Sequence, residues 1–234
     1  MSDIKIELKG IEKVFEMEDV DTYALRGVDL VIRAGEYVSV SGPSGCGKST
    51  LLSILGLLDT ASEGQYFIEG KDVTHLSIDE AAEIRNNKIG FIFQSFNLID
   101  ELSVFDNVAL PLRYSVEEYT EEQIASRVKE CLDMVEMSHR SGHKPNHLSG
   151  GQQQRIAIAR ALVAKPAMLL VDEPTGNLDS KSGDNVMNIL QELNDKGTTI
   201  CMVTHDPRYA DMAKRQLKLF DGKIAAHESM EKSA

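Results

Sequence analysis

The feature that most constrains this chain is a glycine-rich octapeptide at residues 42–49, Gly-Pro-Ser-Gly-Cys-Gly-Lys-Ser. It fits the pattern Gly-x-x-x-x-Gly-Lys-Ser of a P-loop, a turn that holds phosphate groups. Gly42, Gly45 and Gly47 permit backbone conformations closed to residues with a side chain, so successive N–H groups can converge on one anion. Lys48 adds a positive charge at the same place. The octapeptide therefore predicts a site for the phosphates of a nucleotide.

The sequence on either side of the octapeptide supplies the context that a P-loop requires. Residues 37–41 alternate in hydrophobic character, which predicts a buried strand, and residues 48–58 predict a helix whose N-terminus faces the phosphates. Ser49 offers a hydroxyl to a magnesium ion, a cation that prefers oxygen ligands. This context favours a nucleotide site over a chance glycine-rich turn. The predicted nucleotide-contacting positions are Gly42, Pro43, Ser44, Gly45, Cys46, Gly47, Lys48, Ser49 and Thr50.

Length, charge and cysteine content limit the class of protein. A chain of 234 residues can bury a sizeable core, and we expect one domain with lobes. Its net charge of -12 argues against a nucleic-acid surface, which needs clustered Lys and Arg. Three scattered cysteines do not suggest a disulfide framework and fit a reducing cytoplasm. Cys46 lies inside the P-loop. We interpret it as a small residue tolerated at a variable position of the motif rather than as a redox-sensitive thiol, although a helix N-terminus can lower the pKa of a thiol.

Hydrophobic patterning gives no sign of a membrane-spanning segment. The N-terminus lacks an apolar signal core, and the longest apolar run, residues 51–58, is interrupted by Ser53 and Gly56. We therefore expect that the chain does not cross a membrane alone. The acidic stretch 16–21 is expected to be a solvated loop, and the polar tail 227–234 to be frayed.

The order of apolar patterns predicts a mixed α/β fold. Alternating residues at 4–8 and 28–32, with a short strand at 64–70, predict an antiparallel sheet in the N-terminal third. An apolar strand at 89–93 ends at Gln94, and residues 104–162 have helical periodicity. The runs 168–171 and 199–203, separated by a helical pattern at 181–193, predict a βαβ unit and hence a parallel sheet.

Polar residues at the ends of these predicted strands are candidates for catalysis. If the strand before Asp172 lies beside the P-loop strand, Asp172 can hold magnesium and Glu173 can take a proton from an attacking water. On their own, the two acids could equally cap the next helix, because helix N-termini favour acids. His205 could contact the terminal phosphate, or it could be an ordinary strand-end histidine.

A second anion-binding pattern lies at residues 148–152, Leu-Ser-Gly-Gly-Gln, before a helical pattern. A hydroxyl, two glycines and a helix N-terminus again assemble N–H donors. In order, the P-loop, this stretch and Asp172-Glu173-Pro174 resemble the ATP-binding cassette (ABC) family of ATPases over nearly the whole chain. The resemblance implies that two chains dimerise head to tail, each signature stretch closing over ATP held by the partner's P-loop.

The same resemblance assigns fold and domain boundaries. It implies an α/β fold with a P-loop NTPase core of the RecA-like type, an antiparallel β subdomain and an inserted α-helical subdomain. It also implies a single ABC ATP-binding domain over 1–234, with the core and β lobe at about 1–94 and 163–234 and the helical lobe at about 95–162.

Site roles are carried over residue by residue. The resemblance makes Gln94 the glutamine that touches magnesium and water, Asp179 the partner-facing aspartate and His205 the switch histidine. Phe15 would stack on adenine, with Tyr23 as a less favoured substitute, and either ring is chemically adequate. The implied cofactors are ATP and Mg²⁺. The implied catalytic residues are Glu173, His205, Gln94 and Lys48; the implied metal ligands are Ser49, Gln94 and Asp172; and the signature contacts to nucleotide are Ser149, Gly150, Gly151 and Gln152.

Three further stretches, residues 93–98, 107–112 and 173–179, are similar to the lipoprotein-releasing and macrolide-exporting subgroup. That similarity implies an ATP hydrolase that drives export by partner membrane permease subunits, on the cytoplasmic face of the bacterial inner membrane and cytoplasmic when isolated. The segment 94–112 is expected to dock those subunits through exposed Phe96 and Phe105. The alternative is a soluble ABC ATPase that remodels nucleic acid or ribosomes; such chains carry a coiled-coil insertion or a second cassette. His139, His143 and His147 are not expected to form a metal site because Gly142 and Pro145 interrupt any common helix.

Overall fold

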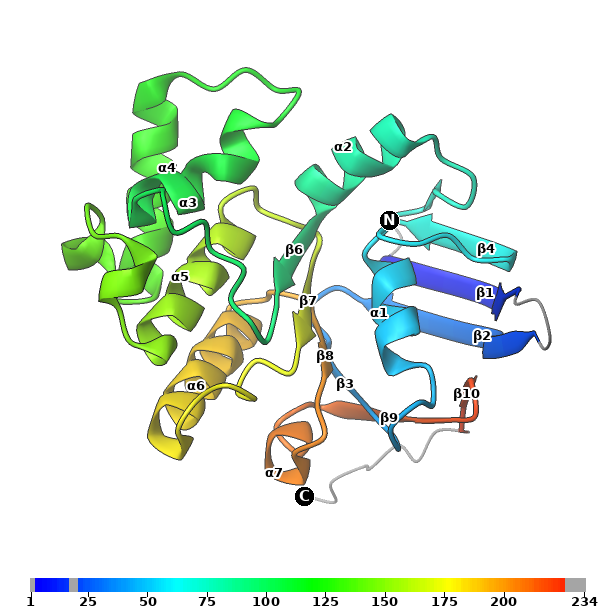
Figure 1. Cartoon of the computed structure of the whole chain (residues 1–234). Helices are drawn as coiled ribbons and strands as arrows, with labels where there is room; N and C mark the ends of the chain where they lie inside the picture. Colours follow the sequence, from blue (N-terminus) through cyan, green and yellow to red (C-terminus); the bar gives the residue numbers. More distant parts are fainter. Residues whose placement is uncertain (1–2, 17–20, 226–234) are drawn as a thin grey trace.

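The computed structural model describes residues 3–16 and 21–225, which form two sheets with helices around them (Figure 1). Most of the predicted acidic loop at 16–21 and the whole of the predicted frayed tail lie outside the described residues. Within the described ranges, none of the helices is long and apolar enough to cross a membrane.

The first sheet is antiparallel and comes from the N-terminal third, as the sequence predicts. Its strand order is β2-β1-β4-β5. Apolar side chains on one face, among them Ile6, Leu8 and Tyr66, are buried, while residues between them are exposed or half-buried. The period of two thus places one face of this sheet against the core. The strands are β1 (Ile4–Phe15), β2 (Thr22–Arg33), β4 (Glu63–Ile68) and β5 (Lys71–Asp72).

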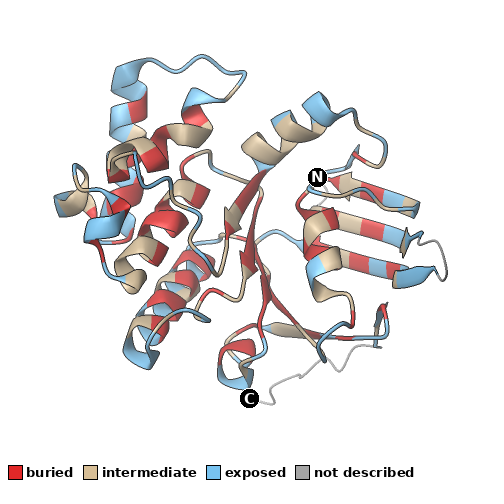
Figure 2. Ribbon diagram, in the orientation of Figure 1, coloured by how far each residue is buried: buried red, intermediate tan, exposed pale blue. Residues whose placement is uncertain are grey.

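The second sheet forms the centre of the molecule, with strand order β10-β9-β3-β8-β7-β6. The five strands from β9 to β6 run parallel, and β10 pairs antiparallel with β9. Strands β7 and β8 are buried on both faces, which explains their continuous apolar runs (Figure 2). The strands are β3 (Tyr37–Ser41), β6 (Ile89–Ile92), β7 (Met168–Asp172), β8 (Ile200–Val203), β9 (Arg215–Phe220) and β10 (Lys223–Ile224).

Two hydrophobic clusters cover the two faces of this central sheet. Alternate residues of β7 separate between them: Met168 and Leu170 pack with α1 and the antiparallel sheet, and Leu169 and Val171 pack with helices α3 to α6. The helices are α1 (Lys48–Leu55), α2 (Ile78–Lys88), α3 (Val104–Arg113), α4 (Glu121–Met134), α5 (Gly150–Leu162), α6 (Ser180–Asp195) and α7 (Pro207–Ala210). The fold class is thus as predicted, whereas the residue boundaries of the lobes stay a prediction.

Two helices differ from the sequence-based expectation. Helix α1 ends at Leu55 rather than at residue 58, because the backbone leaves the helical conformation at Leu57, which has φ 53°. Gly56, just after the helix, packs closely on Phe91, and a Cβ there would lie 2.0 Å from the ring. Helix α2 was not predicted. It buries none of its residues, so it lacks the apolar period that reveals a helix.

The three histidines spaced by four do not share a helix. His139 lies in a short 3-10 turn, Ser138–Arg140, and His147 in a second, Pro145–His147. His143 lies between the turns, where its Nε2 atom is 3.0 Å from Nη1 of Arg140.

Candidate active site

The P-loop joins β3 to α1, as predicted. Gly47 adopts φ 104°, and a Cβ there would lie 2.4 Å from the carbonyl oxygen of Ala24 in β2. A side chain at this position would therefore meet both backbone strain and backbone atoms. The neighbouring β2 strand thus packs directly against the loop at the start of α1.

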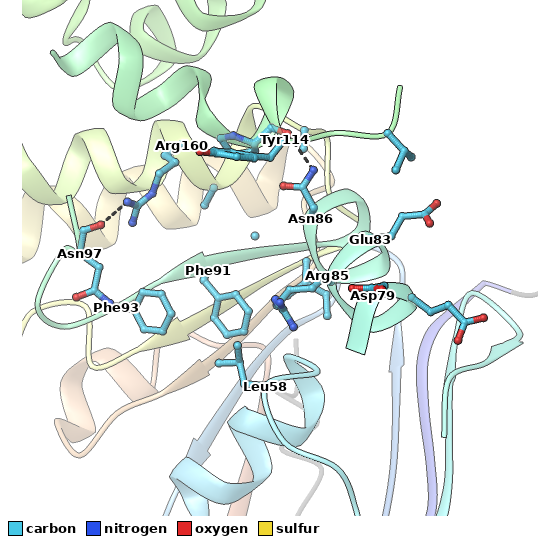
Figure 3. Close-up of a pocket in the computed structure, with 18 residues that line it drawn as sticks. Leu58, Asp79, Glu83, Arg85, Asn86, Phe91, Phe93, Asn97, Tyr114 and Arg160 are labelled. Atoms are coloured by element: carbon cyan, nitrogen blue, oxygen red, sulfur yellow. Dashed lines mark hydrogen bonds between the residues drawn. The ribbon is translucent and has the colours of Figure 1, made fainter. Parts of the chain in front are cut away.

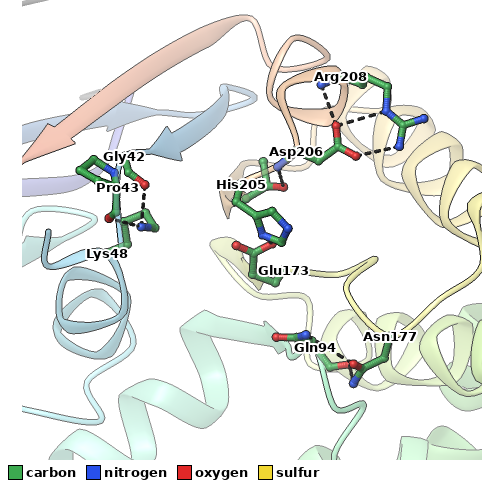
Figure 4. Close-up of polar contacts among 10 residues, drawn as sticks. Gly42, Pro43, Lys48, Gln94, Glu173, Asn177, His205, Asp206 and Arg208 are labelled. Atoms are coloured by element: carbon green, nitrogen blue, oxygen red, sulfur yellow. Dashed lines mark hydrogen bonds and ion pairs between the residues drawn. The ribbon is translucent and has the colours of Figure 1, made fainter. Parts of the chain in front are cut away.

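Positive groups gather at this loop. Lys48 begins α1, and its ammonium donates to the carbonyl oxygens of Gly42 and Pro43, both at 2.8 Å (Figure 4). The first turn of a helix leaves its backbone N–H groups without partners inside the helix, and the fully described first turn of α1 carries no acid. Cys46 is buried, with its Sγ atom 3.8 Å from Nζ of Lys48. Helix N–H donors, a helix dipole and an ammonium suit a polyphosphate chain.

Asp172 is the last residue of β7 and Glu173 follows it. The expectation that this strand lies beside the P-loop strand β3 is wrong, because β7 is one strand further away. Strand β8 lies between β7 and β3, and Val203 pairs with both Val40 and Asp172. Burial, and then the neighbouring carboxylate of Glu173, raise the pKa of Asp172. A carboxylate in that position is stabilised by a bound cation, so its environment fits a magnesium ligand.

Glu173 and His205 are brought together from adjacent strands. Glu173 sits in the left-handed region with φ 46°, and its N–H donates to the carbonyl oxygen of Val203 at 3.0 Å. Its Oε2 atom lies 2.7 Å from Nδ1 of His205, whose ring is largely exposed while the carboxylate is largely covered (Figure 4). The next residue, Asp206, is held by an ion pair, in which Nη2 of Arg208 lies 2.7 Å from the Asp206 carboxylate.

Gln94 lies just after β6, near the end of β7. Its Nε2 atom is 3.4 Å from Oδ1 of Asn177, and Nδ2 of Asn177 donates to the backbone oxygen of Gln94 at 3.1 Å (Figure 4). The predicted glutamine is thus held by a residue that follows the candidate acids by only a few positions. Sequence analysis did not assign a role to Asn177.

The signature stretch begins α5. Ser149 is the N-cap of the helix: its hydroxyl accepts from the N–H of Gln152 at 3.4 Å, and the Gln152 side chain accepts from the N–H of Ser149 at 3.0 Å. Gly150 packs on Leu178 and Gly151 on Ser182, both at the start of the α6 region. The start of α5 and helix α1 lie on opposite sides of β7 (Figure 1). The two predicted anion half-sites of one chain are therefore not brought together.

The partner-facing aspartate of the resemblance, Asp179, has a local structural role. It is the N-cap of α6, where its carboxylate accepts from the N–H of Ser182 at 3.0 Å and from its hydroxyl at 2.6 Å. These hydrogen bonds lower the pKa of Asp179.

The two candidate aromatics for adenine lie on neighbouring strands. Phe15 pairs with Thr22 and Tyr23 pairs with Val14, so the two rings lie on opposite faces of the antiparallel sheet. Both are exposed, at 40% for Phe15 and 46% for Tyr23. Nζ of Lys13 lies 5.0 Å from the centre of the Phe15 ring.

Comparison with known proteins identifies a family, and within it one relative named as an ATP-binding/permease protein and one named as an ATP-binding protein. Residues 25–176 match the family model described as ABC transporter. The chain is 47% identical, over 97% of its length, to a macrolide export ATP-binding/permease protein of Bdellovibrio bacteriovorus, and spans 34% of that relative. It is 46% identical, over 96% of its length, to an uncharacterised ABC transporter ATP-binding protein of Methanocaldococcus jannaschii, MJ0796, and spans 97% of it.

Solved structures resemble nearly the whole chain. The dimeric, post-hydrolysis structure of the ATP-binding cassette MJ0796 bound to ADP and Pi matches with a TM-score of 0.87 and 44% identity, over 97% of this chain and all of that one. A further dimeric structure of the same cassette matches with the same TM-score, at 45% identity and with the same coverage of both chains.

Proposed function

Since the chain belongs to the ABC transporter family and is an ABC-type ATP hydrolase, we propose that its site residues act on Mg²⁺-ATP shared by two copies of the chain. The observation that carries this proposal is the gathering of the P-loop, Asp172, Glu173, His205 and Gln94 at one edge of the central sheet. Ligands of open α/β sheets bind at the carboxyl ends of the strands, where the P-loop and these four residues lie.

The P-loop and its neighbours bind the phosphates. Lys48 exchanges the loop carbonyls for phosphate oxygens, and the N–H groups of the first turn of α1 donate to the same anion. Ser49, Gln94 and Asp172 would hold the magnesium ion, which would supply positive charge against the negative charge that develops on the phosphates during hydrolysis.

Glu173 acts as the general base. Its carboxylate takes the proton of the attacking water, while His205 holds that carboxylate through Nδ1 and presents the rest of its exposed ring to the terminal phosphate. Phe15 stacks on the adenine ring.

A second copy completes each site. Within one chain, the signature residues Ser149 to Gln152 lie at the start of α5, on the far side of β7 from the P-loop (Figure 1). A two-fold axis that brings each signature against the partner's P-loop pairs both half-sites at once, so ATP lies between the copies. The dimeric structures of MJ0796 support this arrangement.

A groove beside the Gln94 segment receives the membrane subunits. It has a volume of about 800 Å³ and lies between α2, β6 and the helices α3 and α5. The rings of Phe91 and Phe93, stacked with 5.1 Å between centres, lie along it, and Tyr114 lies at its other side with 79% of its surface exposed (Figure 3). Asp79 and Glu83 of α2 add an acidic edge. This chemistry fits a short permease helix with apolar residues on one face and a cation toward α2.

The expected docking aromatics differ from those that line the groove. Phe96 and Phe105 are half-buried: Phe96 packs beside Gly150, and Phe105 packs on the core that α3 shares with α4 and α5. The expectation that they are exposed is therefore wrong. Tyr114 takes their place because α3 ends at Arg113 and leaves the next side chain outside the core.

Coupled to such a permease, the chain drives export or extrusion from the cytoplasmic face of the bacterial inner membrane. The relatives named as ATP-binding/permease proteins favour this function over a soluble ATPase that remodels nucleic acid or ribosomes. The test is identification of the proteins that copurify with the chain from detergent-solubilised membranes. An integral-membrane permease supports the proposal, and copurification with ribosomes instead would replace it by the alternative.

A further inference from the structure

A buried amide connects the segments of the site. Gln154 of α5 is fully buried, and its Nε2 atom donates to the carbonyl oxygen of Pro174 at 2.9 Å and to that of Phe93 at 3.3 Å. Its Oε1 atom is buried without a hydrogen-bond partner among the described residues.

The orientation of this amide follows from its neighbours. Both neighbours are carbonyl oxygens, which accept but cannot donate, so the nitrogen must face them. The oxygen is then left unpaired in the core, which destabilises the fold. An apolar side chain of similar length would remove the unpaired oxygen but would also deprive the carbonyl oxygens of Phe93 and Pro174 of this donor, so what the glutamine contributes is a link between those two backbone segments.

The two accepting carbonyls flank two catalytic candidates. Phe93 directly precedes Gln94, and Pro174 directly follows Glu173. Gln154 itself belongs to the helix that begins just after Ser149. One side chain thus ties the signature helix to the two segments that face the chain's own nucleotide.

We propose that Gln154 is a positioning residue that couples the two nucleotides of the dimer. When the partner's ATP seats against the start of α5, the shift of that helix passes through the Gln154 amide to Gln94 and Glu173. The inference rests on the proposed ATP-bridged dimer. It assigns to Gln154 no contact with nucleotide, since the side chain is enclosed in the core.

The chain offers a chemically matched control. Asn194, at 2% exposure near the end of α6, donates from Nδ2 to the carbonyl oxygens of Gly35 and Thr198 at 3.0 and 2.8 Å, and its Oδ1 atom is also buried without a partner in the described structure. It thus has the same buried amide, two acceptors and unpaired oxygen. Its acceptors lie in turns before β3 and β8, at the opposite ends of those strands from the nucleotide segments.

The experiment compares Gln154→Met and Gln154→Glu with Asn194→Leu. For each variant, the melting temperature without nucleotide, kcat, KM and the Hill coefficient for ATP are measured. We expect the Gln154 variants to lose about ten- to a hundredfold in kcat, as small misplacements of catalytic groups do, with KM changed by less than about threefold. Their Hill coefficient should fall towards one. Asn194→Leu should keep wild-type kcat and Hill coefficient whatever its melting temperature.

Either of two kinetic results would overturn the proposal: wild-type kcat and cooperativity in a folded Gln154 variant, or an equal loss of kcat in Asn194→Leu. If neither Gln154 variant folds while Asn194→Leu does, Gln154 is a structural residue and the proposal fails. Light scattering of Glu173→Gln with Mg²⁺-ATP measures whether the chain dimerises, and so tests the proposed ATP-bridged dimer independently of Gln154. If that chain stays monomeric, the dimer and this inference fall together; if it dimerises, the inference alone is at stake.

Discussion

The Nδ1 atom of His205 lies 2.7 Å from the Oε2 atom of Glu173, and the two residues come from the ends of neighbouring strands. The histidine side chain is 74% exposed and the carboxylate side chain only 17%. Glu173 is thus shielded from bulk water while its partner faces the open side of the site. The contact holds the carboxylate through Oε2, so in the proposed mechanism Oε1 is the oxygen that takes the proton of the attacking water.

The first prediction concerns Glu173→Gln, which keeps the shape of the side chain and removes the base. Single-turnover hydrolysis should fall by about a hundred- to ten-thousandfold, the usual contribution of a general base. ATP affinity should stay close to wild type because the P-loop is unchanged. Rapid-quench kinetics and equilibrium binding measure the two effects, and near-normal hydrolysis would exclude Glu173 as the base.

The second prediction concerns the signature half-site. Ser149→Arg places a long cation where the N-cap hydroxyl lies, while Lys48 and its loop are untouched. In the Glu173→Gln background, this variant should still bind ATP but remain a monomer, whereas Glu173→Gln alone dimerises with Mg²⁺-ATP and separates after exchange to ADP. Sedimentation of both variants with Mg²⁺-ATP and with ADP measures whether each is a monomer or a dimer. An ATP-dependent dimer of the double variant would rule out the proposed sandwich.

Local patterns predicted the segments of the site, but not the contacts between them. The P-loop glycines and the apolar run before Asp172 each lie within a few residues, so composition and period revealed the strands and the turn. The pairing of Gln94 with Asn177 joins residues 83 positions apart and leaves no local pattern. The same is true of Gln154, whose amide meets the oxygen of Phe93 across 61 positions.

Helix α2 was missed for a different reason: the prediction relied on hydrophobic periodicity, which this helix lacks. It buries no residue, yet Ser77 and Glu80 form a capping box, with the Ser77 N–H donating to the Glu80 carboxylate at 2.9 Å. That Ser-x-x-Glu spacing was the available signal. A search for hydrophobic period alone could not find a helix that lies at the surface and borders a groove.

The third prediction separates the two aromatic candidates for adenine. Phe15→Ala should weaken ATP binding by about 5- to 150-fold, since stacking of a base on an aromatic ring contributes roughly 1 to 3 kcal/mol. Tyr23→Ala, on the opposite face of the same sheet, should bind ATP normally. Calorimetric titration with ATP and with inorganic triphosphate tests this, because neither variant should change triphosphate affinity. The reverse order of the two variants would move the role to Tyr23.

The fourth prediction follows from the pKa of Asp172, which burial and Glu173 raise. The ionised Asp172 carboxylate therefore destabilises the folded state at pH values above its pKa in the folded protein. This destabilisation disappears below the ordinary pKa of an aspartate, where the carboxyl group is protonated in both the folded and the unfolded chain. In metal-free buffer Asp172→Asn should raise the melting temperature at pH 7 to 8, and the gain should shrink as the pH falls.

Asp179 serves as a control because its pKa is shifted in the opposite direction from that of Asp172. Hydrogen bonds from Ser182 lower the pKa of Asp179, so its ionised form stabilises the fold above the unfolded pKa, and that stability is lost on acidification. Asp179→Asn should thus lower the melting temperature at pH 7 to 8, with a smaller loss at low pH. Thermal melts of both variants across pH 4 to 8 give the comparison. A lower melting temperature for Asp172→Asn at pH 8 would contradict the assigned cost.

The last prediction concerns the groove and its membrane partner. Tyr114 is 79% exposed at the groove, and Ile78 is 89% exposed at the start of α2 but does not line it. Tyr114→Glu should reduce recovery of the permease by at least about tenfold, because central aromatic anchors often contribute 2 kcal/mol or more to an interface. Ile78→Glu introduces the same charge on a comparably exposed apolar residue and should leave recovery unchanged. Both chains should bind ATP normally, since the groove lies apart from the P-loop, so loss of binding to solubilised permease reports docking alone. Equal recovery of the permease by Tyr114→Glu and wild type would place the docking surface elsewhere on the chain.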